Sequence, residues 1–282
     1  MADSLRQRVL TALLLAGLVI AALLGLPGHA AVAAIALVML AGAWEWAVFA
    51  GLTSTAGRAG YAALVAITIA LLWTASGDGA NLRAILILTM LWWLAGFLWL
   101  SLASGRGGHL AAALAGLAVL APAAVGLARL VLIEPQGREL LLFLLVLTTA
   151  ADVGAFFGGR RFGRRKLAPA ISPGKSWAGV WSGMLGTLLI AVLWLVFDGR
   201  GLAYYDSFFT LINEKWTTIG LAVAVVFLVT MSIVGDLFES LVKRSAGAKD
   251  SSALLPGHGG VLDRIDALLP VFPIALAIAP PT

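Results

Sequence analysis

The chain has no cysteine among its 282 residues, which excludes disulfide bonds and thiolate metal ligands. Any bound metal ion must therefore be held by oxygen or imidazole, which favours hard cations such as Mg²⁺. Charged residues are also scarce, at 12% of the chain, against roughly 25% in an average soluble domain. So little charge excludes an ordinary water-exposed surface for a protein of this size.

Hydrophobic residues make up 61% of the chain and occur in runs of about 17 to 25, the length with which an α-helix crosses a bilayer. The first run, preceded by Arg6 and Arg8, also resembles a signal peptide, but the many later runs favour an uncleaved first helix. We predict an all-α, polytopic integral membrane protein with about nine transmembrane helices. The predicted spans lie near residues 9–26, 30–49, 59–75, 83–101, 109–132, 139–158, 177–197, 216–235 and 260–279.

The positive residues are clustered along the chain. If the N-terminus is cytoplasmic, most Lys and Arg residues fall on the cytoplasmic side, and those outside are Arg83, Arg138, Arg200 and Lys215. This asymmetry agrees with the positive-inside rule and predicts that the polar loops 159–176 and 236–259 share the cytoplasmic face. The net charge of +5 then suits anionic lipid headgroups, and no nucleic-acid partner is expected.

One polar stripe follows the eighth predicted span. Asp236, Glu239, Ser240 and Lys243 are spaced so that a continuing helix would present them on one face. Asp236 comes directly after the apolar run, at a depth where ionisable groups are costly and usually functional. For Glu239 and Lys243, an ion pair within the helix is an alternative explanation that requires no function.

A second polar segment follows this stripe. Its residues, in order, are Lys249, Asp250, Pro256, Gly257, His258, Gly259, Gly260, Asp263, Arg264 and Asp266. Glycines let backbone N–H groups approach a phosphate closely, and a helix that begins just after them adds its positive end. Asp263 and Asp266 could hold a divalent ion together with Asp236 if the two helix ends meet. A glycine-rich turn alone would be weak evidence for this site.

The segment 152–176 carries a further aspartate and a basic cluster. Asp152 lies near the inner end of an apolar span, which indicates a polar cavity, or else a pair with a nearby arginine. Ser172 and Pro173 predict an N-cap and first helical residue for the seventh span, with Lys175 beside the helix start. The cluster Arg160, Arg161, Arg164 and Arg165 would either contact lipid headgroups or gather a lipid phosphate.

The order of these residues is more specific than any single motif. Ser240-x-x-Lys243-Arg244-x-x-x-x-Lys249-Asp250, then Pro256-x-His258-Gly259-Gly260-x-x-Asp263-Arg264-x-Asp266, resembles the signature of CTP:phosphatidate cytidylyltransferases, or CDP-diacylglycerol synthases. The resemblance includes Leu5-Arg6-Gln7-Arg8-Val9, Trp44-Glu45-Trp46 and residues 152–175, and so covers most of the chain. The family usually has a glutamate at the position of Ala178, so any contribution of that carboxylate to nucleotide or metal binding is missing here.

The resemblance implies transfer of a cytidylyl group from CTP to phosphatidic acid by a homodimeric enzyme of the bacterial inner membrane. For this reaction we predict Asp236, Lys243 and Asp263 as catalytic residues, with Mg²⁺ held by Asp236, Asp263 and Asp266. The site could also bind a second cation, monovalent or divalent. The predicted substrate-binding residues are Asp152, Ser172, Lys175, Ser176, Glu239, Ser240, Arg244, Lys249, Asp250, His258, Gly259, Gly260 and Arg264.

Two other functions compete with this interpretation. A secondary transporter would also have many spans and intramembrane carboxylates, such as Glu45, but transporters tend to show internal repeats, and none is evident here. A related CTP-transferase or a lipid kinase that acts on another lipid is an alternative closer to the cytidylyltransferase interpretation. We expect a single membrane domain over residues 1–282, with N-terminal spans over about 5–135 and a catalytic half over about 138–282. Within the N-terminal spans, three tryptophans could serve a subunit interface or a lipid-facing belt: Trp92, Trp93 and Trp99.

Overall fold

The structure is a computed structural model that describes residues 14, 17–22, 25–102, 108–133, 136–198, 208–255 and 259–278. Its helices are α2 Gly28–Phe49, α3 Thr55–Ala75, α4 Gly79–Leu102, α5 His109–Leu132, α6 Gln136–Phe162, α7 Trp177–Asp198, α8 Phe208–Ser245, α9 Leu262–Ile265 and α10 Leu268–Ile278. The short antiparallel strands β1 Lys166–Ala168 and β2 Ser172–Ser176 form a hairpin between α6 and α7.

Seven helices in the described part of the chain, α2 to α8, are long and apolar enough to cross a membrane. The prediction of an all-α membrane protein is thus confirmed. The predicted span 9–26 lies mostly outside the described residues. The predicted span 260–279 is divided into α9 and α10, and the 11 residues of α10 extend only about 16 Å, too short to cross a bilayer alone. Instead α10 lies in the core, where Leu269–Leu276 are buried.

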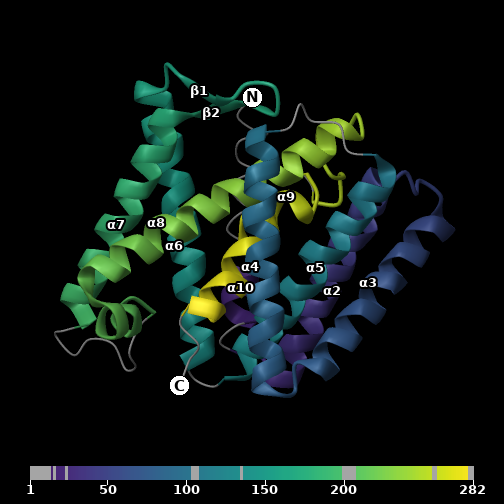
Figure 1. The fold of residues 1–282 in the computed structure, drawn as a ribbon, viewed down its shortest axis with the longest axis horizontal. Coiled ribbons are helices and arrows are strands. Elements are labelled where there is room, and N and C mark those ends of the chain that lie inside the picture. The colour runs from purple at the N-terminus through teal and green to yellow at the C-terminus, as the bar shows by residue number, and fades with distance from the viewer. Residues whose placement is uncertain are drawn as a thin grey trace.

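Two groups of helices flank the central helices α4 and α10 (Figure 1). Helices α2, α3 and α5 pack together on one side, while α6 and α7 form the other side. Hydrogen bonds tie the first group together, because Trp46 Nε1 of α2 donates to Ala112 O (2.8 Å) and Tyr61 Oη of α3 donates to Ala113 O (2.7 Å). Such bonds satisfy polar side chains within lipid-facing bundles.

Helix α8 crosses the molecule from the α6–α7 side to α9, and passes α4 and α10 on the way (Figure 1). Its contact with α4 is aromatic, since Phe238 packs edge-on against Trp92, Trp93 and Trp99 at centroid distances of 6.5, 5.6 and 5.9 Å. The three tryptophans that the sequence suggested for an interface or a lipid belt therefore contact α8 within the chain, and position its C-terminal half.

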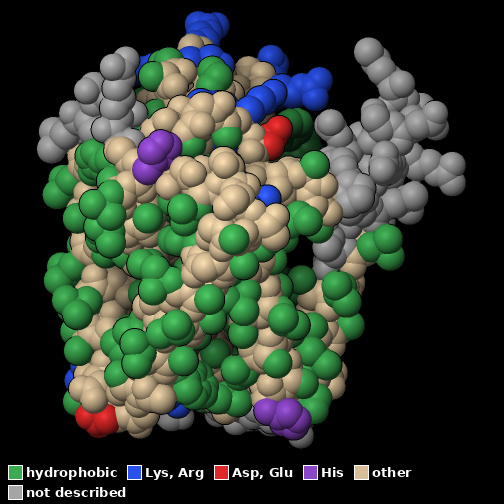
Figure 2. All heavy atoms as spheres, turned by 90° about the vertical axis from the view of Figure 1, so that its right-hand side faces the viewer, with side chains coloured by type: hydrophobic (Ala, Val, Ile, Leu, Met, Phe, Trp, Pro, Cys, Tyr) green, Lys and Arg blue, Asp and Glu red, His purple; other side chains and the backbone are tan. Residues whose placement is uncertain are grey.

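The surface matches a bilayer in its middle and water or headgroups at its ends. Figure 2 shows hydrophobic side chains over most of one face and Lys and Arg side chains gathered at the upper end. The hairpin, the C-terminal end of α8 and α9 also lie at the upper end in Figure 1. Elsewhere, exposed residues such as Leu185, Leu189 and Val223 would face lipid acyl chains. The two polar segments of the sequence thus meet at one end of the bundle.

Candidate functional site

The predicted stripe on α8 exists, because the helix continues past the apolar run to Ser245. Ser240 Oγ donates to Asp236 Oδ1 (3.3 Å), and Lys243 Nζ donates to Glu239 Oε2 (2.9 Å), one turn apart in each case. Glu239 and Lys243 are buried, so their ion pair is not a surface feature. The spacing in the sequence was sufficient to predict this face.

Lys243 also joins α8 to α9. Its Nζ lies 2.5 Å from Asp263 Oδ1, and Asp263 Oδ2 accepts from Gly260 N (2.8 Å), Ser251 N (3.1 Å) and Ser251 Oγ (2.9 Å). Burial by itself would raise the pKa of Asp263, but the hydrogen bonds from Lys243 and the Gly260 N–H outweigh it and lower that pKa. The Asp263 carboxylate is therefore held in its ionised form.

Asp266 completes the acidic group at the turn between α9 and α10. A Cβ on Gly235 would overlap Asp266 O, so only glycine lets α8 approach this turn so closely. Burial, and next the charge of Asp236, raise the pKa of Asp266 to about 6. Glu239 lies beside Asp266, and its Oε1 atom is buried. Carboxyl groups are crowded here, and a bound cation would stabilise their ionised forms.

Among the described residues, no three His, Asp or Glu side chains form a ready-made metal site. The donor set nevertheless fits Mg²⁺, which takes carboxylate oxygens and keeps several waters. In the structure two lysines neutralise these carboxylates, since Lys243 contacts Asp263 and Lys175 Nζ lies 2.7 Å from Asp236 Oδ2. A divalent ion at Asp236 would have to replace the ammonium group of Lys175.

Lys175 comes from the hairpin, whose local structure differs from the prediction. Ser172 does not cap the seventh span: Ser172–Ser176 forms β2, and α7 begins at Trp177. Ser176 is the capping residue instead, because its Oγ accepts from Gly179 N at 3.2 Å. Pairing with β1 keeps the segment extended up to Ser176, an interaction that residues read one after another do not reveal.

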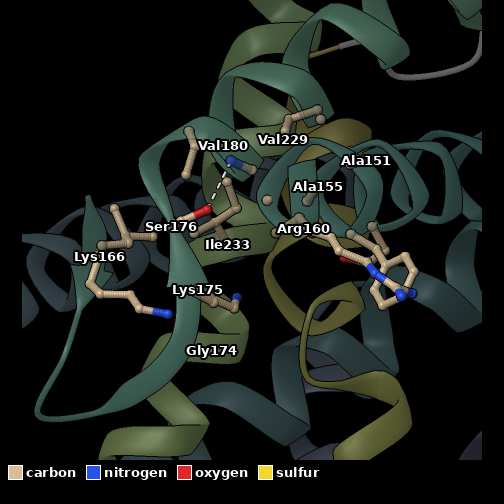
Figure 3. A pocket seen from close by; sticks show the side chains of 17 residues that line it. Ala151, Ala155, Arg160, Lys166, Gly174, Lys175, Ser176, Val180, Val229 and Ile233 are labelled. Carbon is tan, nitrogen blue, oxygen red and sulfur yellow. Dashed lines mark hydrogen bonds between the residues drawn. The ribbon is translucent and has the colours of Figure 1, made fainter. Parts of the chain in front are cut away.

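A cavity of about 650 Å³ lies between the hairpin, α6, α7 and α8. In Figure 3, Lys166, Lys175 and Ser176 line it on the side of the hairpin, and Arg160 lines it on the side of α6. Its deeper wall is made of small and apolar side chains, and Asp152 lies on its lining. The charges of Lys175, Asp236 and Arg264 act on Asp152, which places the cavity beside the α8 stripe.

Several predicted binding residues do not line this cavity. Arg244, Lys249, Asp250 and Arg264 are exposed, and Arg244 donates to Ala248 O of its own turn (3.1 Å). Gly259 has a φ of 83° and pairs with Leu255. His258 lies outside the described residues, with Pro256 and Gly257. The arginines of the basic cluster are exposed at the end of α6 and between α6 and β1, and Arg165 lies over the Trp177 ring at 5.8 Å.

The sequence interpretation did not include Glu45, Ser251 and Ser252 in the site. Glu45 of α2 is fully buried and accepts hydrogen bonds from both serine hydroxyl groups. One signal was available: a carboxylate flanked by Trp44 and Trp46 within an apolar run requires polar partners. Those partners lie more than 200 residues further along the chain, so the sequence could not identify them.

The fold and the site define a polytopic membrane protein with a cavity lined by lysine, arginine and aspartate at one end of its helices. The sequence profile of the Cytidylyltransferase family matches residues 6–279, and the chain belongs to this family. This membership does not support the transporter alternative.

Curated relatives agree with the family assignment. The chain is 39% identical over 280 residues to a phosphatidate cytidylyltransferase of Pseudomonas aeruginosa, which covers 97% of this chain and 96% of the relative. It is 37% identical over 287 residues to one of Haemophilus influenzae, which covers 95% and 96%. A shorter match, 41% identical over 140 residues, joins 48% of this chain to 45% of a phosphatidate cytidylyltransferase of Brucella suis.

Proposed function

We propose that this protein transfers the cytidylyl group of CTP to phosphatidic acid, which gives CDP-diacylglycerol and pyrophosphate. The observation that carries the proposal is the meeting of the Lys175–Asp236 and Lys243–Asp263 pairs beside a cavity with an apolar deeper wall. A lipid phosphate and a nucleotide need such a place, charged at the membrane boundary and apolar behind it. The curated relatives, which are phosphatidate cytidylyltransferases, support the assignment.

The reaction depends more on the stabilisation of negative charge than on a general base. A phosphate oxygen of phosphatidic acid attacks the α-phosphorus of CTP, the bond to the β-phosphate oxygen breaks, and pyrophosphate leaves. The second pKa of a phosphomonoester is about 6, so the nucleophile is already largely ionised near neutral pH. The protein must instead bring two anions together and stabilise the charge that develops on the transferred and leaving oxygens.

Side chains at different positions would neutralise different parts of the phosphate charge. Lys175 lies at the cavity, where it neutralises phosphate together with Arg160 and Lys166. Lys243 lies between α8 and α9, and the exposed Arg244, Lys249 and Arg264 attract the triphosphate from water. Asp236, Asp263 and Asp266 would hold Mg²⁺, which supplies charge neutralisation to the phosphates when it is bound.

The proposal also includes the cellular location of the site and the oligomeric state of the enzyme. The site faces the cytoplasm of a bacterial inner membrane, because CTP is water-soluble and the basic residues gather at this end. The lipid enters sideways, between helices, and the nucleotide enters from the water. The enzyme acts as a homodimer, as the family resemblance implies.

Purified protein in detergent, given CTP labelled at the α-phosphate and a panel of lipid acceptors, tests the activity. We expect labelled CDP-diacylglycerol with phosphatidic acid, loss of turnover on treatment with EDTA, and recovery with Mg²⁺. Label transferred only to another lipid phosphate would assign a related CTP-transferase instead. In a parallel assay with CTP labelled at the γ-phosphate, transfer of that label to a lipid, with none from the α-phosphate, would indicate a lipid kinase.

A further inference from the structure

Glu45 is a carboxylate buried in the protein interior. It lies in α2, and its exposed fraction is 0%, as is that of the adjacent Trp46. A carboxylate at such a position is costly unless polar groups satisfy both of its oxygens. What satisfies Glu45 is therefore informative about its role.

All the described hydrogen-bond partners of the Glu45 carboxylate come from the segment 251–262. Oε1 accepts from Ser252 Oγ and from Val261 N at 2.9 Å, and Oε2 accepts from Leu262 N at 2.8 Å and Ser251 Oγ at 3.3 Å. The backbone donors are those at the start of α9. One side chain of α2 thus holds both ends of the loop that precedes α9.

The same loop holds Asp263. Ser251 Oγ lies between the two carboxylates, at 3.3 Å from Glu45 Oε2 and 2.9 Å from Asp263 Oδ2. Gly260 donates its N–H to Asp263, and a Cβ on Gly260 would overlap Ser251 Oγ and lie 2.6 Å from Glu45 Oε1. Asp263 in turn pairs with Lys243. A continuous set of contacts therefore runs from Glu45 through Ser251 to the charged pair of the site.

We infer that Glu45 is a positioning residue of the transferase site, which fixes Ser251, Ser252 and the start of α9 so that Asp263 and Lys243 are held in their working positions. The inference rests on the proposed function only for its kinetic consequence. The Glu45→Gln substitution keeps the shape but replaces one acceptor oxygen with an NH₂ group. This group would face a backbone N–H or a hydroxyl donor, and the loop would lose part of its attachment.

The kinetic test compares Glu45→Gln with Trp46→Phe, a control on the same helix with the same burial, which loses the bond to Ala112 O and part of the ring packing against Phe49. We expect Glu45→Gln to lower kcat by about 10- to 100-fold with a much smaller change in KM for CTP, because misplacement of reacting groups affects turnover most. Glu45→Asp, which keeps both acceptor oxygens on a shorter side chain, should recover part of kcat. Trp46→Phe should lower Tm and leave kcat unchanged.

A double-mutant cycle identifies the route. If Glu45 acts through Ser251, Glu45→Gln combined with Ser251→Ala should lose little more turnover than the worse single variant. Glu45→Gln combined with Thr230→Val, whose hydroxyl donates to Val226 O within α8, should show additive effects. Unchanged kcat in Glu45→Gln, with a fall in Tm like that of Trp46→Phe, would make Glu45 purely structural and overturn the inference.

A readout without catalysis separates this inference from the proposed function. The native chain has no cysteine, so Leu255→Cys places a single half-buried thiol in the loop. We expect Glu45→Gln to accelerate labelling of this thiol and Trp46→Phe to leave its rate unchanged. Faster labelling in a protein that lacks cytidylyl transfer would keep the positioning role and reject the proposed function. Equal labelling rates in the parent and Glu45→Gln would reject the positioning role.

Discussion

Lys243 neutralises two carboxylates at once, and this changes what its substitution would reveal. The exposed fractions of the side chains are 10% for Lys243, 1% for Glu239 and 9% for Asp263. An exposed pair within a helix contributes only about 0.3 to 0.5 kcal/mol. Removing one partner of a buried pair costs about 3 to 5 kcal/mol instead, because the remaining charge is uncompensated.

Lys243→Met should therefore lower both Tm and turnover, and a second substitution separates the two effects. In Glu239→Gln/Lys243→Met one carboxylate is also neutralised, so we expect Tm to recover in part while kcat stays low. Lys243→Arg should restore turnover only partly, because a planar guanidinium replaces a compact ammonium group. The measurements are thermal unfolding in detergent, and kinetics with saturating phosphatidic acid and varied CTP.

Parent-like kinetics in the double variant would contradict a contact between Lys243 and the triphosphate. Lys243 would then serve only to neutralise Glu239, and Lys175, Arg244 and Lys249 would carry the phosphate charge.

For Asp236, the amide variant Asp236→Asn should lower kcat by about 10² or more, because an electrostatic stabiliser of the transition state is lost. The amount of folded protein should change little, since a neutral amide costs less than a carboxylate near the membrane boundary. Thr230→Val on the same helix, whose hydroxyl bonds to Val226 O, is the matched control and should keep its activity. Near-parent turnover of Asp236→Asn at saturating Mg²⁺ would remove Asp236 from the metal site.

Among the elements, the hairpin of β1 and β2 was not predicted from the sequence. Ser172 and Pro173 have the residue types of a helix start, yet the helix begins after Ser176. The local preference is overridden by the pairing of Lys166 with Ser176 and of Ala168 with Ser172, which needs both strands at once. The hairpin brings Lys175 within 2.7 Å of Asp236.

The two serines at this helix start should respond differently to alanine. Ser176→Ala removes the acceptor for Gly179 N and should destabilise the protein by about 1 kcal/mol, measured as a fall in Tm. Ser172→Ala removes no cap and should leave Tm close to that of the parent. An equal or larger fall in Tm for Ser172→Ala would show that the helix begins at Ser172.

At the scale of the whole molecule, the proposed orientation can be tested without any activity. Ser172→Cys and His258→Cys should resist an impermeant thiol reagent added from the periplasmic side, whereas Asp206→Cys should react, because the positive charge of the chain collects on the other side. The cysteine-free parent serves as the unlabelled control. Periplasmic labelling at position 258 but not at 206 would invert the topology and move the site to the opposite face.

The sequence by itself determined what depends on composition and on spacing within one helix. Hydrophobic runs predicted the membrane helices because a span must satisfy its backbone within itself. Spacings of three and four residues predicted the stripe Asp236, Glu239, Ser240 and Lys243 because α8 is continuous after its kink at Thr217. The motif from Ser240 to Asp266 was sufficient to indicate the family.

Only the tertiary structure decided which distant residues meet. The pairing of β1 with β2, the division of the last span into α9 and α10, and the burial of Trp93 against Phe238 all depend on partners from other elements. Glu45 shows the reason most clearly. A lone buried carboxylate predicts that partners exist, but packing of α2 against the 251–262 loop selects Ser251 and Ser252 as those partners. Hydrogen bonds act over about 3 Å in space, whatever the separation along the chain.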